Sequence, residues 1–210
     1  QAMLKSGWSE DVAISALEET LRSHLNDQAK AASLPAPSIV PEPLADGSQT
    51  SLPAQDREVR VVMAMRNPRV IVFGGLFSDA ECDELIESAR TRLVRSETVE
   101  MATGGNEVNE ARTSDGMFFA RGETPLIQQL EARIGALLGW PVMNGEGLQI
   151  LRYRPGAEYK PHYDYFDPAK SGTASILKRG GQRVASLVCY LNTPAKGGAT
   201  VFPDVHLDVA

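Results

Sequence analysis

A histidine and an aspartate stand two residues apart in the segment Tyr159-Lys-Pro-His-Tyr-Asp164. In an extended strand, residues two apart point to the same face, so the imidazole of His162 and the carboxylate of Asp164 are expected to converge on one point. They would form two-thirds of the two-histidine, one-carboxylate set that holds non-haem Fe(II) and leaves three positions open. The same spacing also suits a partly buried histidine hydrogen-bonded to a neighbouring aspartate.

The segments around this pair decide between these interpretations. They resemble, in the same order, the motifs of the prolyl 4-hydroxylase branch of the Fe(II)/2-oxoglutarate-dependent dioxygenases, in its bacterial type. The matching segments are Arg112-Thr-Ser-Asp-Gly116, Leu151-Arg-Tyr-Arg-Pro-Gly156, Tyr159-Lys-Pro-His-Tyr-Asp164, Gly181-Gln-Arg-Val184, Tyr190-Leu-Asn192 and Gly197-Gly-Ala-Thr-Val-Phe-Pro203. The resemblance implies an α+β fold with a double-stranded β-helix (jelly-roll) core, flanked by N-terminal helices.

The resemblance also implies roles for the residues that bind iron and the cosubstrate. His162 and Asp164 match two iron ligands and are the expected catalytic residues. Tyr153, Tyr190 and Thr200 match residues that line the 2-oxoglutarate pocket. Each has an ordinary alternative, because tyrosines pack well in strands and threonine is common there.

A third group of residues resembles the lining of a peptide-substrate groove. Its members are Tyr159, Arg183, Arg112 and Ser114. Taken without the resemblance, both arginines are equally well interpreted as solvated surface charges.

Two residues that the family requires are not found where the motifs end. The second histidine ligand and the basic residue that pairs with the far carboxylate of 2-oxoglutarate are expected beyond Ala210, after further strands. His24 falls in a predicted helix, and His206 matches a position that is usually not a ligand. We therefore expect the chain to be the front part of a longer enzyme, with the last strands of the jelly roll missing.

The function that the resemblance implies is hydroxylation of prolyl residues in a peptide or protein. Fe(II) is the metal, 2-oxoglutarate is the cosubstrate that becomes succinate and CO2, and L-ascorbate keeps the iron reduced. Two alternatives stay open. One is a 2-oxoglutarate oxygenase acting on another substrate, and the other is a non-catalytic peptide-binding module on the same fold.

Composition excludes some partners. The 210 residues carry a formal net charge of −6, which disfavours a nucleic-acid partner. Two cysteines, Cys82 and Cys189, favour a reducing compartment. The sequence shows no run long enough to span a membrane and no signal peptide, so we expect a cytoplasmic protein without a membrane partner. The oligomeric state is not indicated.

Three regions are predicted along the chain. Residues 1–32 form an N-terminal helical segment, in which Ser9 caps a helix over about residues 10–29. Residues 33–57 are a proline-rich linker. Residues 58–210 form the dioxygenase-like domain.

Patterns within the predicted domain indicate its elements. Ser78 and Glu81 form a capping box that opens a helix with an apolar stripe as far as Leu93, and Thr124-Pro125 opens another that Gly139 ends. A glycine- and asparagine-rich mobile loop is expected at 101–110. Strands are predicted at 59–65, 69–73, 148–153, 158–164, 184–191 and 199–202, with a loop at 168–181.

Overall fold

The computed structural model describes residues 2–33, 49–66, 68–99, 105–205 and 207–209. The chain divides into two compact units. The first contains the N-terminal segment and the segment Tyr165–Val184. The second contains the remaining described residues, including the predicted iron ligands.

Among the described residues of the first unit, the regular elements are helices. Its helices are α1 (Ala2–Lys5), α2 (Glu10–Ala31) and α5 (Thr173–Gly180). The predicted cap of α2 is confirmed, since the Ser9 hydroxyl accepts a hydrogen bond from the Val12 amide at 3.4 Å. Helix α5 corrects the prediction of a loop at 168–181. With only eight residues, α5 has too few positions to show a clear helical pattern in the sequence, although it buries Ile176 and Leu177.

The second unit contains four small antiparallel sheets. The first has the order β1-β2-β3, the second the order β4-β7-β8, and two are hairpins, β5-β6 and β9-β10. Their strands are β1 (Ser51–Ala54), β2 (Arg57–Met65), β3 (Val70–Gly74), β4 (Val94–Arg95), β5 (Thr98–Val99), β6 (Asn106–Glu107), β7 (Asp115–Phe118), β8 (Gln149–Arg152), β9 (Thr200–Phe202) and β10 (Leu207–Val209).

Strand β1 begins the sheet inside the stretch predicted as linker. It pairs with β2 through a tight turn in which Gln55 has a φ of 59°. Leu52 and Ala54 are buried, whereas Pro53 needs no ladder donor because β1 is an edge strand. Pro53, one of the prolines that suggested a linker, therefore lies in a short edge strand, and residues 34–48 of the predicted linker lie outside the described residues.

Helices α3 (Asp79–Ala89) and α4 (Pro125–Leu138) cover this unit's core. The predicted capping box of α3 is confirmed, and so are the Thr124 cap and the left-handed Gly139 end of α4. Helix α3 ends at Ala89, short of the predicted stripe to Leu93. Two clusters form the core. One gathers Leu52, Ala54, Val59, Leu76 and Leu137, and the other gathers Leu85, Ala89, Met117, Phe119, Ile127 and Leu130.

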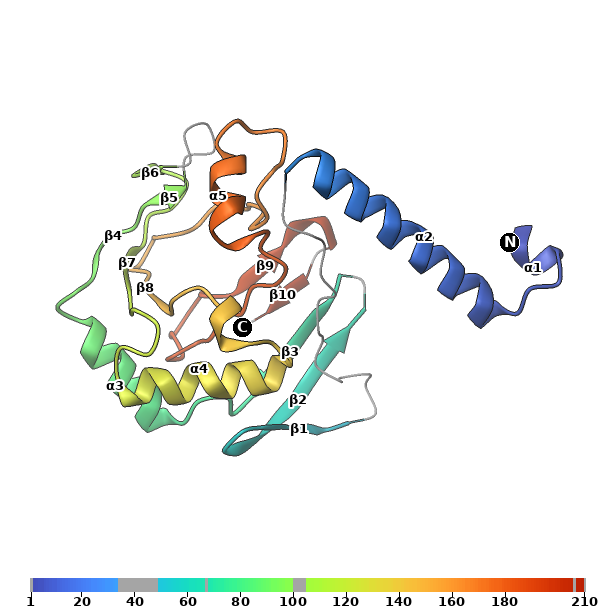
Figure 1. Cartoon of the computed structure of the whole chain (residues 1–210). Helices are drawn as coiled ribbons and strands as arrows, with labels where there is room; N and C mark the ends of the chain where they lie inside the picture. The colour runs from blue at the N-terminus through green and yellow to red at the C-terminus, as the bar shows by residue number, and fades with distance from the viewer. Residues whose placement is uncertain (1, 34–48, 67, 100–104, 206, 210) are drawn as a thin grey trace. The chain divides into compact units, whose positions relative to one another are not determined.

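A buried arginine ties α4 to the first sheet and to α3. Arg133 is fully buried, and its guanidinium donates to both carboxylate oxygens of Asp56 at 2.7 Å and to those of Glu81 at 2.7 and 2.9 Å. It also donates to the Leu76 carbonyl at 2.8 Å. Figure 1 shows α4 running beside the β1-β2-β3 sheet that these bonds anchor.

Two predicted strands are not formed. Residues 158–164 contain only an isolated bridge between Arg112 and Tyr159, and residues 184–191 have no ladder partner among the described residues. A strand needs a neighbour to pair with, so extended, β-prone residues alone do not produce one. The strands predicted at 59–65, 69–73, 148–153 and 199–202 are confirmed as β2, β3, β8 and β9, within a few residues.

Helices and antiparallel sheets confirm the α+β class. Among the helices that the structure describes, none combines the length and hydropathy needed to cross a lipid bilayer.

Candidate functional site

The side chains of His162 and Asp164 lie side by side, although their segment is not a strand. The imidazole Nε2 is 3.3 Å from the carboxylate Oδ1, and the two side chains are 38% and 44% exposed. Two ligand atoms bound about 2.1 Å from one metal at a right angle lie about 3.0 Å apart. The separation of Nε2 and Oδ1 therefore fits two neighbouring positions on one metal ion.

Backbone and hydroxyl groups orient both side chains. The imidazole Nδ1 of His162 lies 2.8 Å from the Lys160 carbonyl, which can only accept, so we assign the proton to Nδ1. Nε2 then keeps its lone pair on the side of Asp164. The Ser186 hydroxyl donates to Oδ2 of Asp164 and leaves Oδ1 beside Nε2. Such supporting hydrogen bonds commonly fix the orientation of metal-binding side chains.

The segment before His162 is held by residues 111–113. The Thr113 amide donates to the Glu158 carbonyl at 2.9 Å, and the Lys160 amide donates to the Ala111 carbonyl at 2.9 Å. The Thr113 hydroxyl also accepts from the Glu158 amide at 2.7 Å. The two backbone bonds flank the isolated antiparallel bridge between Arg112 and Tyr159, and they fix the position of Lys160, whose carbonyl bonds to the imidazole.

Tyr159 lies between an arginine and the histidine. Its ring stacks on His162, with centroids 3.7 Å apart and planes at 22°. The Arg112 guanidinium carbon is 4.9 Å from the Tyr159 centroid. Arg112 is itself buried and donates to the Glu97 carbonyl and to the Gln149 side chain at 3.3 and 3.1 Å. The Arg112 guanidinium thus packs on the Tyr159 phenol, and the phenol in turn supports the imidazole of His162.

Two residues predicted to contact substrate are instead enclosed. Ser114 is completely buried, and its hydroxyl donates to the Ser96 hydroxyl at 2.9 Å. Arg112 is only 8% exposed and serves the stack just described. Neither side chain presents a polar group at the surface of the described chain, and their contact with a substrate stays a prediction. The sequence pattern around residues 112–114 did not show whether these side chains lie at the surface or are buried against a neighbouring segment.

Tyr190 and Thr200, predicted to bind the cosubstrate, meet beside the β9-β10 hairpin. Their hydroxyl oxygens are 2.7 Å apart, and the Thr200 amide donates to the Tyr190 oxygen at 3.0 Å. The Tyr190 hydroxyl donates to the Val209 carbonyl at 2.9 Å. Tyr153 follows β8, is 45% exposed and has no hydrogen bond in the described part of the chain. Of the three residues predicted to bind the cosubstrate, Tyr190 and Thr200 therefore contact each other.

Comparisons with known proteins support one family. Residues 148–209 match the 2OG-Fe(II) oxygenase superfamily. Prolyl 4-hydroxylase 1 of Arabidopsis thaliana is 44% identical over 139 residues, which is 65% of this chain and 47% of the relative. Prolyl 4-hydroxylases 5 and 2 of the same plant are 42% identical over 136 residues and 38% identical over 147 residues. These alignments cover 65% and 70% of this chain, and 45% and 48% of the relatives.

These matches support the prolyl 4-hydroxylase family for this chain. The chain spans about half the length of the curated relatives that it matches. The predicted family is thereby supported, and the 2OG-Fe(II) oxygenase superfamily implies Fe(II) and 2-oxoglutarate as metal and cosubstrate.

The His162–Asp164 pair supplies donors that suit Fe(II), one neutral imidazole nitrogen and one carboxylate oxygen. The described residues contain no group of three His, Cys, Asp or Glu side chains that could hold a metal ion. His206, the weaker sequence candidate, lies outside the described residues. A third ligand and a basic residue beyond Ala210 stay predictions.

Sequence reasoning did not identify two groups that orient the site in this prolyl 4-hydroxylase relative. The Lys160 carbonyl and the Ser186 hydroxyl hold His162 and Asp164. A backbone carbonyl has no residue-type signature, and serine is too common to stand out. Arg183, predicted to contact substrate, belongs to the first unit, where its guanidinium lies 4.7 Å from the centre of the Phe166 ring.

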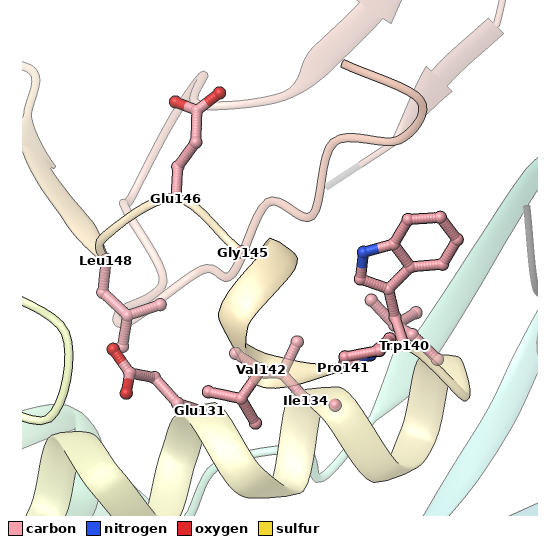
Figure 2. Close-up of a pocket in the computed structure, with 10 residues that line it drawn as sticks. Glu131, Ile134, Trp140, Pro141, Val142, Gly145, Glu146 and Leu148 are labelled. Atoms are coloured by element: carbon pink, nitrogen blue, oxygen red, sulfur yellow. The ribbon is translucent and has the colours of Figure 1, made fainter. Parts of the chain in front are cut away.

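A separate pocket of about 90 Å³ lies between α4 and the turn η1 (Val142–Asn144). Figure 2 shows Glu131 and Trp140 at opposite ends of it, with Ile134 and Val142 between them. Glu131 accepts from the Gly122 amide at 3.0 Å through one oxygen, and its other oxygen is buried without a partner in the described chain. The pocket shares no residue with the predicted iron site.

Proposed function

We propose that the protein is an Fe(II)- and 2-oxoglutarate-dependent dioxygenase that hydroxylates prolyl residues in a peptide or protein. The observation that carries this proposal is the convergence of His162 Nε2 and Asp164 Oδ1 at 3.3 Å. Each side chain is oriented by a hydrogen bond to its other polar atom, which leaves the converging pair available for a metal. The similarity to the prolyl 4-hydroxylase family supports the reaction class.

Fe(II) and 2-oxoglutarate, when bound, supply the oxidising chemistry, with O2 consumed and 2-oxoglutarate converted to succinate and CO2. The residues of this chain bind and orient. His162 and Asp164 hold the metal, and the Lys160 carbonyl keeps the proton of His162 on Nδ1 so that Nε2 can act as a ligand. L-Ascorbate, which keeps such iron reduced, belongs to the proposal as a cofactor.

Tyr190 and Thr200 are proposed to bind the far carboxylate of 2-oxoglutarate. Both hydroxyls lie together, and an ionised carboxylate is a stronger acceptor than the Val209 carbonyl to which Tyr190 now donates. Binding would exchange that hydrogen bond for one to the carboxylate. Tyr190 lies four residues after Ser186, so the Cα atoms of these two residues are at most about 14 Å apart.

The substrate is proposed to be a proline-containing peptide or protein in the cytoplasm. Tyr159 is proposed to contact this substrate from the second unit, and Tyr153 to lie near the cosubstrate, while the substrate contact of Arg183 stays a prediction. The jelly-roll core belongs to the same proposal. It is supported by the superfamily match at residues 148–209 and by the antiparallel pairing of β7 with β8 and of β9 with β10.

An anaerobic titration of Fe(II) and 2-oxoglutarate into the protein tests the site. The expected result is the visible charge-transfer band of chelated 2-oxoglutarate, lost in His162→Ala and kept in the matched control His24→Ala, whose histidine lies in helix α2. The titration is run on this chain and on the full-length protein. A band in the full-length protein alone would show that the third ligand comes from outside this chain.

A second measurement tests the reaction. Proline-rich peptides are incubated with the full-length protein, Fe(II), 2-oxoglutarate, ascorbate and O2, and succinate and peptide mass are followed together. Addition of one oxygen atom to proline with equal succinate is the expected result. Peptide binding that is unchanged in His162→Ala, with no succinate formed, would instead support a non-catalytic binding module.

A further inference from the structure

Helix α2 carries an uncovered apolar stripe. Ile14, Leu17, Leu21 and Leu25 fall on one side of the helix and are 47%, 60%, 57% and 39% exposed. Leucine and isoleucine repeated at this spacing normally mark the buried face of a helix. Isolated helices are marginal in water, so a stripe of this length needs a partner surface.

The stripe is symmetric about its own centre. When a second α2 is laid antiparallel with its midpoint near Glu19, Ile14 of one copy lies level with Leu25 of the other, and Leu17 lies level with Leu21. Because the pair is symmetric, Leu21 and Leu25 of the first copy also lie level with Leu17 and Ile14 of the second. The interface therefore has four apolar layers. A contact of this kind is isologous, because the same patch serves both copies and the pair closes.

The charges of α2 favour the antiparallel arrangement. Its first half carries Glu10, Asp11, Glu18 and Glu19 and no basic residue, whereas its second half carries Arg22 and Lys30 and a single acidic residue, Asp27. A parallel pair would place the two acidic halves together. An antiparallel pair places each acidic half beside a basic one and opposes the two helix dipoles.

One charge pair gives this arrangement a specific contact. Glu18 flanks the apolar stripe, and Arg22 lies one turn further on the same flank. In the antiparallel register, Glu18 of each copy lies within one turn of Arg22 of the other. In the described chain, neither side chain forms an ion pair.

We propose that α2 is a self-association helix that pairs antiparallel with α2 of a second copy of this chain. The interface contains the four apolar layers and two Glu18–Arg22 contacts between copies. An interface of two single helices is at the small end of specific contacts, so we expect a weak dimer whose population rises with protein concentration.

Sedimentation equilibrium of the whole chain over a range of concentrations tests the proposal. The expected mass rises from one to two copies with concentration. Leu17→Asp/Leu21→Asp stays at one copy, whereas Val12→Asp, on the opposite side of α2, dimerises like the parent chain. Circular dichroism of each variant shows whether the helix itself is retained.

A charge exchange tests the orientation. Glu18→Arg places arginine near Arg22 of the other copy and weakens the dimer about tenfold, and Glu18→Arg/Arg22→Glu restores it. Mass that stays at one copy at all concentrations, or dimers equally weakened by Val12→Asp, would overturn the proposal. So would a monomer in which Leu17→Asp/Leu21→Asp lowers the melting temperature, because the stripe would then be covered within one chain.

Discussion

The phenol ring of Tyr159 stacks on the imidazole of His162 with ring centroids 3.7 Å apart. On the other side of the phenol lies the guanidinium of Arg112, which is buried and held by two acceptors. The histidine is thus supported through its ring face as well as through Nδ1. Tyr159, which is expected to contact substrate, thus also supports the ring of His162, the proposed metal ligand.

Replacement of Tyr159 should weaken metal binding without unfolding the chain. Tyr159→Phe keeps the stacked ring and should keep the affinity for Co(II), used as a spectroscopic substitute for Fe(II) in the full-length protein. Tyr159→Ala removes the ring and should lower that affinity about tenfold. Equal affinities of the alanine and phenylalanine variants would show that the stack does not position His162.

Ser186→Ala should also affect the metal ligands. The variant removes the hydroxyl that donates to Oδ2 of Asp164 and so frees the carboxylate to rotate. Loss of such a supporting hydrogen bond commonly lowers metal affinity between about 10-fold and 100-fold. Ser175→Ala is the matched control, because that serine donates only to the Gly172 carbonyl in the first unit. An effect of equal size in both variants would contradict the assigned role.

Arg133→Met should strongly destabilise the second unit. It leaves Asp56 and Glu81 without their buried partner, and removal of one member of such a network costs about 3 kcal/mol. Arg90→Met removes an exposed ion pair with Glu87 and should cost less than about 1 kcal/mol. Urea unfolding followed by circular dichroism measures both. Similar midpoints for the two variants would show that the network contributes little.

The same network predicts sensitivity to acid. Hydrogen bonds from Arg133 lower the pKa of Glu81 from its usual 4.5 to about 2 and the pKa of Asp56 below its usual range. As pH falls below about 5, the unfolded chain therefore takes up protons before the folded chain. The free energy of unfolding should decrease from about pH 5 towards pH 2, and in Arg133→Met it should change less over the same range.

Both cysteine thiols should react slowly in the folded protein. Cys189 packs against the cluster around Leu137, and burial raises the pKa of its thiol to about 12. Burial and nearby carboxylates also raise the pKa of Cys82. Titration with a disulfide reagent at pH 8 should be slow until denaturant is added, when both thiols should react. Rapid reaction of Cys189 without denaturant would contradict its burial.

Local signals predicted the helices that cover the core of the second unit. The caps at Ser78 and Thr124 and the glycine end at Gly139 are formed by neighbours in sequence, so they could be recognised without a structure. Strand β1 could not, because Pro53 is tolerated only at an edge, and an edge is a property of the whole sheet.

The site was predicted in part for a similar reason. His162 and Asp164 have a recognisable spacing, and they do converge. The burial of Ser114 and the bond from Ser186 depend on segments far away in sequence, which a local pattern cannot bring together. The strand predicted at 158–164 is reduced to the single antiparallel bridge between Arg112 and Tyr159, because its backbone pairing with residues 111–113 does not continue past Lys160.

The segment Tyr165–Val184 begins directly after Asp164 and ends just before Ser186, and these two residues hydrogen-bond across its base. Within the segment, the Gln182 side chain bonds to both the amide and the carbonyl of Phe166, at 2.7 and 2.9 Å. These hydrogen bonds hold the two ends of the segment together and do not involve the residues between them. A longer segment would add little to the entropic cost of closing the loop, because that cost grows only slowly with loop length. This is a natural point for insertion or exchange of sequence, where relatives could diverge, or a designer could graft, without displacing a metal ligand.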